Sequence, residues 1–249
     1  MSKQQETERN LGNIAMLIDG DNAQHKILEQ MVEEVSRYGT LTYRRAYGDW
    51  TQVNLAGWRP VMLANAIHAK QQFSNTKGKN ATDSALIIDA MDILHSGKVQ
   101  GFCIVSSDSD YTSLCMRIRE EGLFVMGMGH KQTPESLIKA CDVFVYVENL
   151  IKSDETSQPQ VTTDTSPEDH IGLMKLMNSA FDISVREDGW VHLSALGDAL
   201  RRIDPSFDSR TYGHKTLSLL IKSLPKQFNI KETKKNGPSS TYYVRMIEG

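Results

Sequence analysis

The sequence is poor in the residues that build several common kinds of functional site. It has only three cysteines, Cys103, Cys115 and Cys141, and no Cys-x-x-Cys pair, so neither a disulfide framework nor a zinc site is expected. Each cysteine lies in an apolar context, which favours a buried, reduced thiol. No apolar run approaches the length of a membrane span, and residues 1–10 lack the apolar centre of a secretory signal. We therefore expect a cytoplasmic protein that makes no use of a membrane.

Charge is distributed unevenly along the 249 residues. Residues 1–150 carry 15 basic and 18 acidic side chains, whereas residues 170–249 carry 12 basic and 8 acidic ones. The segment 151–169 is rich in Ser, Thr, Gln, Pro and acidic residues and has no periodicity, which is typical of a flexible linker. The sequence therefore predicts two domains, at 11–150 and 170–249. The basic balance of the second is compatible with a nucleic-acid partner.

The stretch 101–114 combines a buried strand with a pair of acidic residues. Its apolar part, 102–105, predicts a strand, and helical spacing follows the acidic loop. Asp108 and Asp110 therefore lie in the kind of loop where open α/β sheets bind ligands. Carboxylates held together resist ionisation, so a divalent cation is the simplest partner for them. For this loop taken alone, capping of the next helix by Asp108 or Ser109 explains the sequence equally well.

Apolar runs that indicate strands alternate with helical patterns through the first 150 residues. The expected strands are 13–18, 41–47, 68–73, 102–105, 123–128 and 143–147. This alternation predicts right-handed crossovers and a three-layer α/β fold with a mainly parallel sheet. The carboxyl ends of parallel strands share one edge of the sheet. We therefore expect Asp19, at the end of the first strand, to approach Asp108 although the two are far apart in sequence.

A third carboxylate is expected at the same edge. Asp83 opens a helix predicted over 83–95, with Thr82 as a plausible N-cap, and helix N-termini in such folds face the edge where the strands end. Asp89 and Asp92 are turned by about 240° and about 180° from Asp83, at about 100° per residue. We expect these two side chains to be solvated or paired with basic groups.

Residues 170–249 show a second pattern, of three helices and a terminal hairpin. The expected helices begin at 171, 194 and 212, and the expected strands are 228–232 and 241–246. An Asn-Gly pair marks the turn of the hairpin. This order of elements is typical of a small winged helix-turn-helix domain.

Several short motifs stand out in both domains. In the first they are Ile18-Asp19-Gly-Asp21-Asn22, Gly78-Lys79-Asn80-Ala81-Thr82-Asp83, Ser106-Ser107-Asp108-Ser109-Asp110 and Ala140-Cys141-Asp142. Together these resemble the NYN branch of the PIN-like nucleases, in particular its LabA-like group, over residues 13–149. In the second they are Asp188-Gly189-Trp190-Val191, Phe207-Asp208-Ser209-Arg210-Thr211-Tyr212-Gly213 and the closing hairpin. These resemble the OST-HTH/LOTUS module over residues 170–246.

The resemblance to these nucleases implies metal-dependent cleavage of RNA by a PIN-like fold. The family's metal-binding carboxylates correspond here to Asp19, Asp83, Asp108 and Asp110. The family asparagine corresponds to Asn22, which is expected to orient Asp19 or a water ligand. Phosphodiester hydrolysis needs a strong nucleophile and charge relief at the phosphate, and Mg²⁺ or Mn²⁺ held by carboxylates supplies both.

The resemblance of the second domain implies RNA binding. Some LOTUS modules favour G-rich or structured RNA and others contact protein partners, so both remain open here, as does a homo-oligomer. The basic residues that could contact phosphates are Lys79 in the first domain and Arg210, Lys215, Lys222, Lys234 and Lys235 in the second. A solvated basic face is the alternative explanation for them.

Two other functions are compatible with the sequence. Asp19-Gly-Asp21 also resembles the nucleophile and acid pair of haloacid-dehalogenase-like phosphatases, in which case Asp108 and Asp110 would serve as the further acidic pair. Alternatively, the chain is an RNA-binding adaptor whose nuclease site is weak or idle. An aspartyl-phosphate trapped at Asp19 would favour the phosphatase, and RNA binding without metal-dependent cleavage would favour the adaptor.

Overall fold

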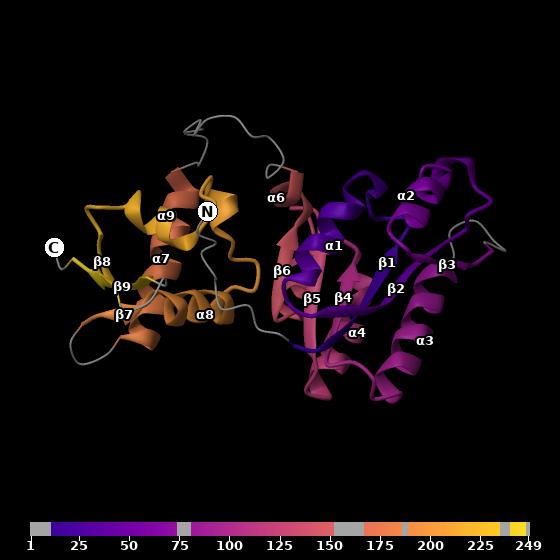
Figure 1. The fold of residues 1–249 in the computed structure, drawn as a ribbon, viewed down its shortest axis with the longest axis horizontal. Coiled ribbons are helices and arrows are strands. Elements are labelled where there is room, and N and C mark those ends of the chain that lie inside the picture. Colours follow the sequence, from indigo (N-terminus) through magenta and orange to yellow (C-terminus); the bar gives the residue numbers. More distant parts are fainter. Residues whose placement is uncertain (1–10, 74–80, 152–166, 186–188, 235–239, 248–249) are drawn as a thin grey trace. The chain divides into compact units, whose positions relative to one another are not determined.

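The chain folds into two compact units in a computed structural model (Figure 1). The structure describes residues 11–73, 81–151, 167–185, 189–234 and 240–247. The first unit comprises the described residues up to 151, and the second comprises those from 167 onwards. Of the predicted linker 151–169, residues 152–166 lie outside the described ranges, and a helix already begins at Pro167.

A six-stranded parallel sheet forms the centre of the first unit (Figure 1). Its strands are β1 (Asn13–Asp19), β2 (Thr40–Gly48), β3 (His68–Gln71), β4 (Gly101–Val105), β5 (Phe124–Gly129) and β6 (Val143–Tyr146). Their order across the sheet is β3-β2-β1-β4-β5-β6, and every neighbouring pair is parallel. The predicted α/β fold with a mainly parallel sheet is confirmed.

Helices cover both faces of this sheet and complete three layers. One face packs against α1 (Leu28–Ser36), α2 (Trp58–Ala64) and α6 (Val147–Ile151), and the other packs against α3 (Ala81–His95), α4 (Thr112–Glu120) and α5 (Glu135–Lys139). Side chains of β1 alternate between the two cores, with Met16 and Ile18 in the first and Leu17 in the second. The same alternation turns Asp19 towards the layer of α3 and α4.

The order of the strands reverses between β1 and β4. From β1 the chain builds β2 and then β3 outwards on one side, and α3 carries it back past β2 and β1 to β4 on the other side. In open α/β sheets such a reversal leaves a crevice at the carboxyl ends of the two central strands. The loops that follow Asp19 and Val105 border this crevice, and they are the loops in which the acidic motifs lie.

The second unit is a small helical domain with a three-stranded antiparallel sheet. Its elements are α7 (Pro167–Ser184), β7 (Val191–His192), α8 (Leu193–Ile203), a 3₁₀ turn (Ser209–Tyr212), α9 (Leu217–Lys222), β8 (Phe228–Lys234) and β9 (Ser240–Met246). The strand order is β7-β9-β8. The core joins all three helices to the sheet through Met177, Leu196, Leu220 and Val244. No helix in the described ranges has the length and hydropathy to cross a membrane.

The third helix of this unit is shorter than the sequence suggests. Gly213 adopts a left-handed conformation, with φ of 78°, and ends the preceding 3₁₀ turn. The helix α9 begins only after Thr216, which is extended and whose hydroxyl caps the helix by accepting a hydrogen bond from the Leu219 amide at 3.3 Å. Lys215 therefore precedes α9, whereas the apolar pattern places it on the helix.

Candidate metal centre

Three carboxylates meet at the carboxyl edge of the parallel sheet. Asp83 comes from the first turn of α3, while Asp108 and Asp110 follow β4. One carboxylate oxygen from each of the three lies within 4.8 Å of the other two. Asp83 and Asp108 are half-buried and Asp110 is exposed, so water could reach a cation held among them. The fold thus brings together three of the four carboxylates that the sequence singles out.

The loop after β4 shapes this cluster. Asp108 is the N-cap of the 3₁₀ turn Ser109–Tyr111, and its Oδ1 accepts a hydrogen bond from the Asp110 amide at 2.9 Å. The Asp108 amide in turn donates to Ser106 Oγ at 3.1 Å. The capping interpretation of Asp108 is therefore confirmed, and it is compatible with binding a cation, because the cap bond occupies only one of the two carboxylate oxygens.

Asp19 is the fourth carboxylate and does not belong to this group of three. Its side chain is fully buried at the end of β1. Oδ2 accepts hydrogen bonds from Asn22 Nδ2 at 2.7 Å and from Ser106 Oγ at 3.0 Å, and Oδ1 accepts one from the Asp21 amide at 3.1 Å. Asn22 and Ser106 therefore fix the orientation of Asp19. Ser106 also ties β1 to the loop that carries Asp108.

Tyr111 connects Asp83 to this arrangement. Its buried hydroxyl donates a hydrogen bond to Asp83 Oδ1 at 2.7 Å. Burial and the negative charge of Asp19 raise the pKa of the Tyr111 phenol, so it stays protonated and donates at neutral pH. Tyr111 is not among the site residues expected from the sequence. Its only signal in the sequence is position, because Tyr111 directly follows Asp110 at the start of a predicted helix and its large side chain ends in a hydroxyl.

The electrostatics of this edge oppose the ionisation of its carboxylates. Burial raises the pKa of Asp19, although the hydrogen bonds from Asn22 and Ser106 offset part of this. Burial also raises the pKa of Asp83, against the Tyr111 bond, and the charges of Asp19, Asp108 and Asp110 raise it further. A divalent cation would relieve this repulsion. The donors are carboxylate oxygens without histidine or cysteine, which suits Mg²⁺ or Mn²⁺ better than Zn²⁺.

Asp89 and Asp92 lie on the same helix and have no part in the cluster. Asp89 pairs with the guanidinium of Arg45, accepts a hydrogen bond from the Tyr47 hydroxyl and lies 3.7 Å from Lys70 Nζ. Against the effect of burial, these partners hold the pKa of Asp89 below its ordinary value. Asp92 is exposed. The expectation that these two carboxylates are paired or solvated is confirmed.

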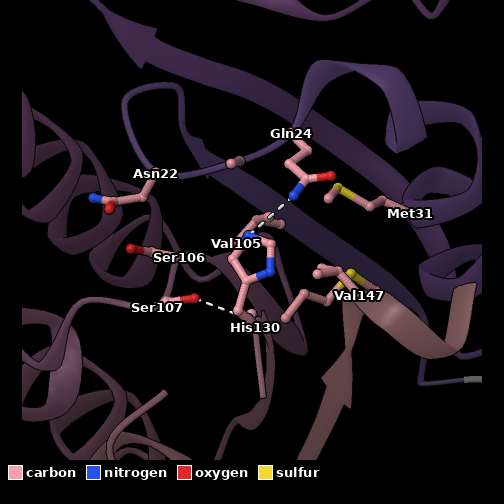
Figure 2. A pocket seen from close by; sticks show the side chains of 11 residues that line it. Asn22, Gln24, Met31, Val105, Ser106, Ser107, His130 and Val147 are labelled. Atoms are coloured by element: carbon pink, nitrogen blue, oxygen red, sulfur yellow. Dashed lines mark hydrogen bonds between the residues drawn. The ribbon is translucent and has the colours of Figure 1, made fainter. Parts of the chain in front are cut away.

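A small pocket lies next to Asn22 and Ser106 (Figure 2). Its volume is about 10 Å³, which is enough for one water molecule. Figure 2 shows His130 at the pocket, where its ring contacts the side-chain amide of Gln24 at 3.3 Å. The His130 amide donates to Ser107 Oγ at 2.8 Å, and its Nδ1 lies 3.0 Å from Glu148 Oε1. The bond to Ser107 links the end of β5 to the loop before Asp108, and the contacts with Gln24 and Glu148 link it to the loop after β1 and to α6.

His130 and Glu148 are not among the site residues expected from the sequence. His130 stands after a Gly-Met-Gly segment at the end of β5, a position that resembles the strand-end positions of Asp19 and Asp108. That place was the only local signal for it. Glu148 lies in the helix α6, 18 residues further on, and only the folded chain brings it to the imidazole ring.

The basic residues expected to contact RNA have different environments. Lys79 and Lys235 lie outside the described residues, and Lys234 ends β8. Lys215 and Lys222 are exposed, and Lys222 Nζ lies 5.3 Å from the centroid of the Tyr242 ring.

Arg210 is held within its own turn. Its Nε donates to Asp208 Oδ2 at 2.8 Å, and its Nη2 lies 2.6 Å from the same oxygen. The two side chains are only 19% and 17% exposed, so a phosphate would have to compete with an enclosed ion pair. Asp208 also caps the turn by accepting a hydrogen bond from the Arg210 amide at 2.8 Å. A phosphate contact by Arg210 therefore stays a prediction, and it would require this ion pair to open.

Comparison with known proteins adds family matches to this geometry. The model of the NYN domain matches residues 13–150, and the model of the OST-HTH/LOTUS domain matches residues 169–240. A crystal structure of a protein of unknown function from Vibrio parahaemolyticus is similar at 19% identity, over 58% of this chain and 96% of that chain, with a TM-score of 0.46. An NMR structure of an uncharacterized protein from Nitrosomonas europaea is similar at 27% identity, over 38% and 91%, with a TM-score of 0.29. No curated protein matches.

Proposed function

The chain belongs to the NYN domain family, with an OST-HTH/LOTUS domain after it, and we propose that it hydrolyses RNA phosphodiesters with a bound Mg²⁺ or Mn²⁺. NYN domains are PIN-like nucleases and LOTUS domains bind RNA, so the two matches support a combined nuclease and RNA-binding role. The observation that carries the proposal is the meeting of Asp83, Asp108 and Asp110 at the reversal of strand order. Ligands of open α/β sheets bind at this place.

Asp83, Asp108 and Asp110 would hold the cation directly. Such an ion, when bound, supplies positive charge that offsets the negative charge of the scissile phosphate, and it lowers the pKa of the attacking water. Asp19 is proposed as a further ligand or as the group that orients the nucleophile. Two observations support this role. The Asp19 carboxylate is buried with a raised pKa, and it lies close enough to Asp83 for its charge to raise the pKa of Asp83 as well.

Other residues hold these carboxylates in place. Asn22 and Ser106 occupy Oδ2 of Asp19, and Tyr111 occupies Oδ1 of Asp83, so each of these carboxylates has a defined orientation before any ligand arrives. Preorganised groups of this kind avoid the cost of rearrangement during the reaction. Asn22 is thus proposed as a positioning residue of the catalytic site.

The phosphatase alternative finds less support in this geometry. It requires Asp19 to attack a substrate phosphorus atom, yet Asp19 is fully buried and both of its oxygens accept hydrogen bonds. The nuclease proposal needs no such attack, because water is the nucleophile.

The test uses the purified full-length chain with end-labelled single-stranded and structured RNA, in Mg²⁺, Mn²⁺ or EDTA. We expect cleavage in either metal, none in EDTA, and none by Asp108→Asn, which should still bind RNA. Asp92→Asn is the matched control, because it removes an exposed carboxylate outside the cluster and should cleave normally. Calorimetric titration with Mn²⁺ should show binding to the wild type and none to Asp108→Asn.

Two results would replace this proposal. RNA binding without any metal-dependent cleavage by the wild type would support the adaptor function. A phosphate group trapped on Asp19 with a phosphomonoester substrate would support the phosphatase.

A further inference from the structure

The small sheet of the second unit has one face that its core does not use. β9 lies in the middle of this sheet, between β7 and β8. Successive side chains along a strand point to opposite faces. Val244 is buried in the core of the unit, so its neighbours Tyr243 and Arg245 belong to the other face, and Arg245 is exposed. We call this face, with the residues that pair across it, the outer sheet face.

Aromatic rings from two strands gather on the outer sheet face. The register places His192 of β7 opposite Tyr243, and the two rings lie 5.3 Å apart at 88°. Trp190 lies just before β7, and the guanidinium of Arg245 lies over its ring, 5.6 Å from the ring centroid. All three rings are half-buried, so part of each remains accessible to solvent.

The charge of the outer sheet face is positive. Lys231 of β8 lies opposite Tyr243 and is exposed, as is Arg245. Glu232 is the only acidic residue in the three strands, all of whose residues are described, and it pairs with Tyr242 on the other face. A surface with two cations, three rings and no carboxylate in its strands is complementary to an anionic chain that carries flat bases.

We propose that the outer sheet face binds single-stranded RNA, with bases stacking on Tyr243 and Trp190 and with phosphates meeting Arg245 and Lys231. Base stacking on aromatic side chains combined with basic side chains along the backbone is a general solution for unpaired nucleic acid. The inference rests on the proposed RNA-binding role of the second unit and assigns that role to a particular surface.

The alternative surface, around α9, fits RNA less well. A helix that recognises a duplex must enter a groove, and the major groove of A-form RNA is too deep and narrow for side chains to read. α9 has only six residues, and its exposed face includes Leu219. Arg210, which precedes it, is held by Asp208. Paired bases also have no free faces, so a stacking surface selects unpaired RNA.

The test measures binding by fluorescence anisotropy for the full-length chain in EDTA, with a labelled single-stranded RNA of about 12 nucleotides. Tyr243→Thr keeps a residue suited to a strand but removes the ring, and we expect it to weaken binding about tenfold. Tyr243→Phe keeps the stacking surface and should bind within about twofold of the wild type.

Variants of the exposed cations test the phosphate contacts without disturbing the fold. Arg245→Gln and Lys231→Gln should each weaken binding and reduce the slope of log affinity against log salt by about 0.7, the amount expected for one contact to a single strand. The matched control is the double variant Lys215→Gln with Lys222→Gln near α9, which should change affinity less than either single variant of the outer sheet face.

Three outcomes would overturn the assignment. They are unchanged binding by both Arg245→Gln and Lys231→Gln, a larger loss from the α9 double variant than from Tyr243→Thr, or preference for a duplex of the same length over the single strand. The catalytic proposal is tested separately by Mn²⁺-dependent cleavage at saturating RNA, which Tyr243→Thr should retain and Asp108→Asn should lose. Loss of one property without the other therefore shows which proposal has failed.

Discussion

Asp83 and Asp89 are two carboxylates of one helix with opposite electrostatic environments. They are six residues apart on α3, and both are half-buried. Asp83 faces other carboxylates and its pKa is raised, whereas Asp89 faces Arg45 and Lys70 and its pKa is lowered. The difference comes from the partners, because burial acts on both in the same direction.

The comparison separates a structural carboxylate from a functional one. The fold supplies the cations that neutralise Asp89, so this residue contributes to stability without any ligand. Within the described residues, the groups that act most strongly on Asp83 are the neutral phenol of Tyr111, which donates a hydrogen bond to it, and three further carboxylates. Repulsion among these carboxylates costs stability, and a bound cation would recover that cost.

Loss of the Asp83 carboxylate should have the largest effect on activity. We expect Asp83→Asn to reduce Mn²⁺-dependent RNA cleavage by more than about 100-fold, because even outer-shell partners of a metal cost 10–100-fold when they are removed. Asp89→Asn should cleave like the wild type at a temperature where it is folded. Equal activity of wild type and Asp83→Asn would remove Asp83 from the metal site.

Loss of the bond that orients Asp19 should have the next largest effect. We expect Asn22→Ala to reduce cleavage about 10–100-fold, as for other groups that support a metal site, with no change of RNA affinity in EDTA. Gln24→Ala is the matched control, because this nearby amide contacts His130 and not Asp19. A similar loss of cleavage in both variants would mean that the loop, and not the contact with Asp19, matters.

The two carboxylates of α3 should also differ in their effects on stability. Asp89→Asn weakens the interaction with Arg45 and should lower the free energy of unfolding by about 2 kcal/mol, as for a hydrogen bond to a charged group. Asp83→Asn in EDTA removes a repelled charge and should stabilise the protein. Urea unfolding in EDTA measures both, and destabilisation by Asp83→Asn would contradict the repulsion between Asp83 and the neighbouring carboxylates.

The pH dependence of these two effects should have opposite directions. Asp89 has a lowered pKa, so its contribution is present above its unfolded pKa of about 3.8 and is lost as the pH falls through the folded value. Asp83 has a raised pKa, so its contribution is fully present below 3.8 and is lost as the pH rises through the folded value. The stabilisation by Asp83→Asn should therefore grow with pH, whereas the destabilisation by Asp89→Asn should vanish in acid. Melting temperatures in EDTA between acid and neutral pH measure both trends.

Much of the fold could be read from the sequence because the central strands β1 and β4 are buried on both faces. The segments 14–18 and 102–105 are continuous apolar runs. Asp19 directly follows the first run, and Asp108 follows the second after two serines, so one pattern predicts both the strands and the candidate ligands at their ends. The separation of Asp89 from the cluster follows from helical geometry alone. These features depend on local periodicity, which the sequence expresses directly.

Contacts between side chains of distant elements could not be read in this way. The Tyr111 bond to Asp83 spans 28 residues, and the His130 contact with Glu148 depends on where β5 and α6 end. The break before α9 depends on Gly213, whose left-handed conformation leaves no trace in an apolar pattern. The ion pair between Arg210 and Asp208 is local, but it depends on the geometry of the 3₁₀ turn that contains Arg210 and is capped by Asp208.

The sequence by itself determined that strands and helices alternate and that aspartates follow the first and fourth strands. Only the tertiary structure decided that these two strands are neighbours, since alternation specifies parallel strands but not their lateral order. It also decided that Asp19 is enclosed beside the cluster and not within it. Asn22 and Ser106 donate hydrogen bonds to the buried Asp19 carboxylate and hold it in that position. Strand order and the enclosure of single polar side chains such as Asp19 are set by packing across the whole sheet, which the local pattern of apolar residues does not specify.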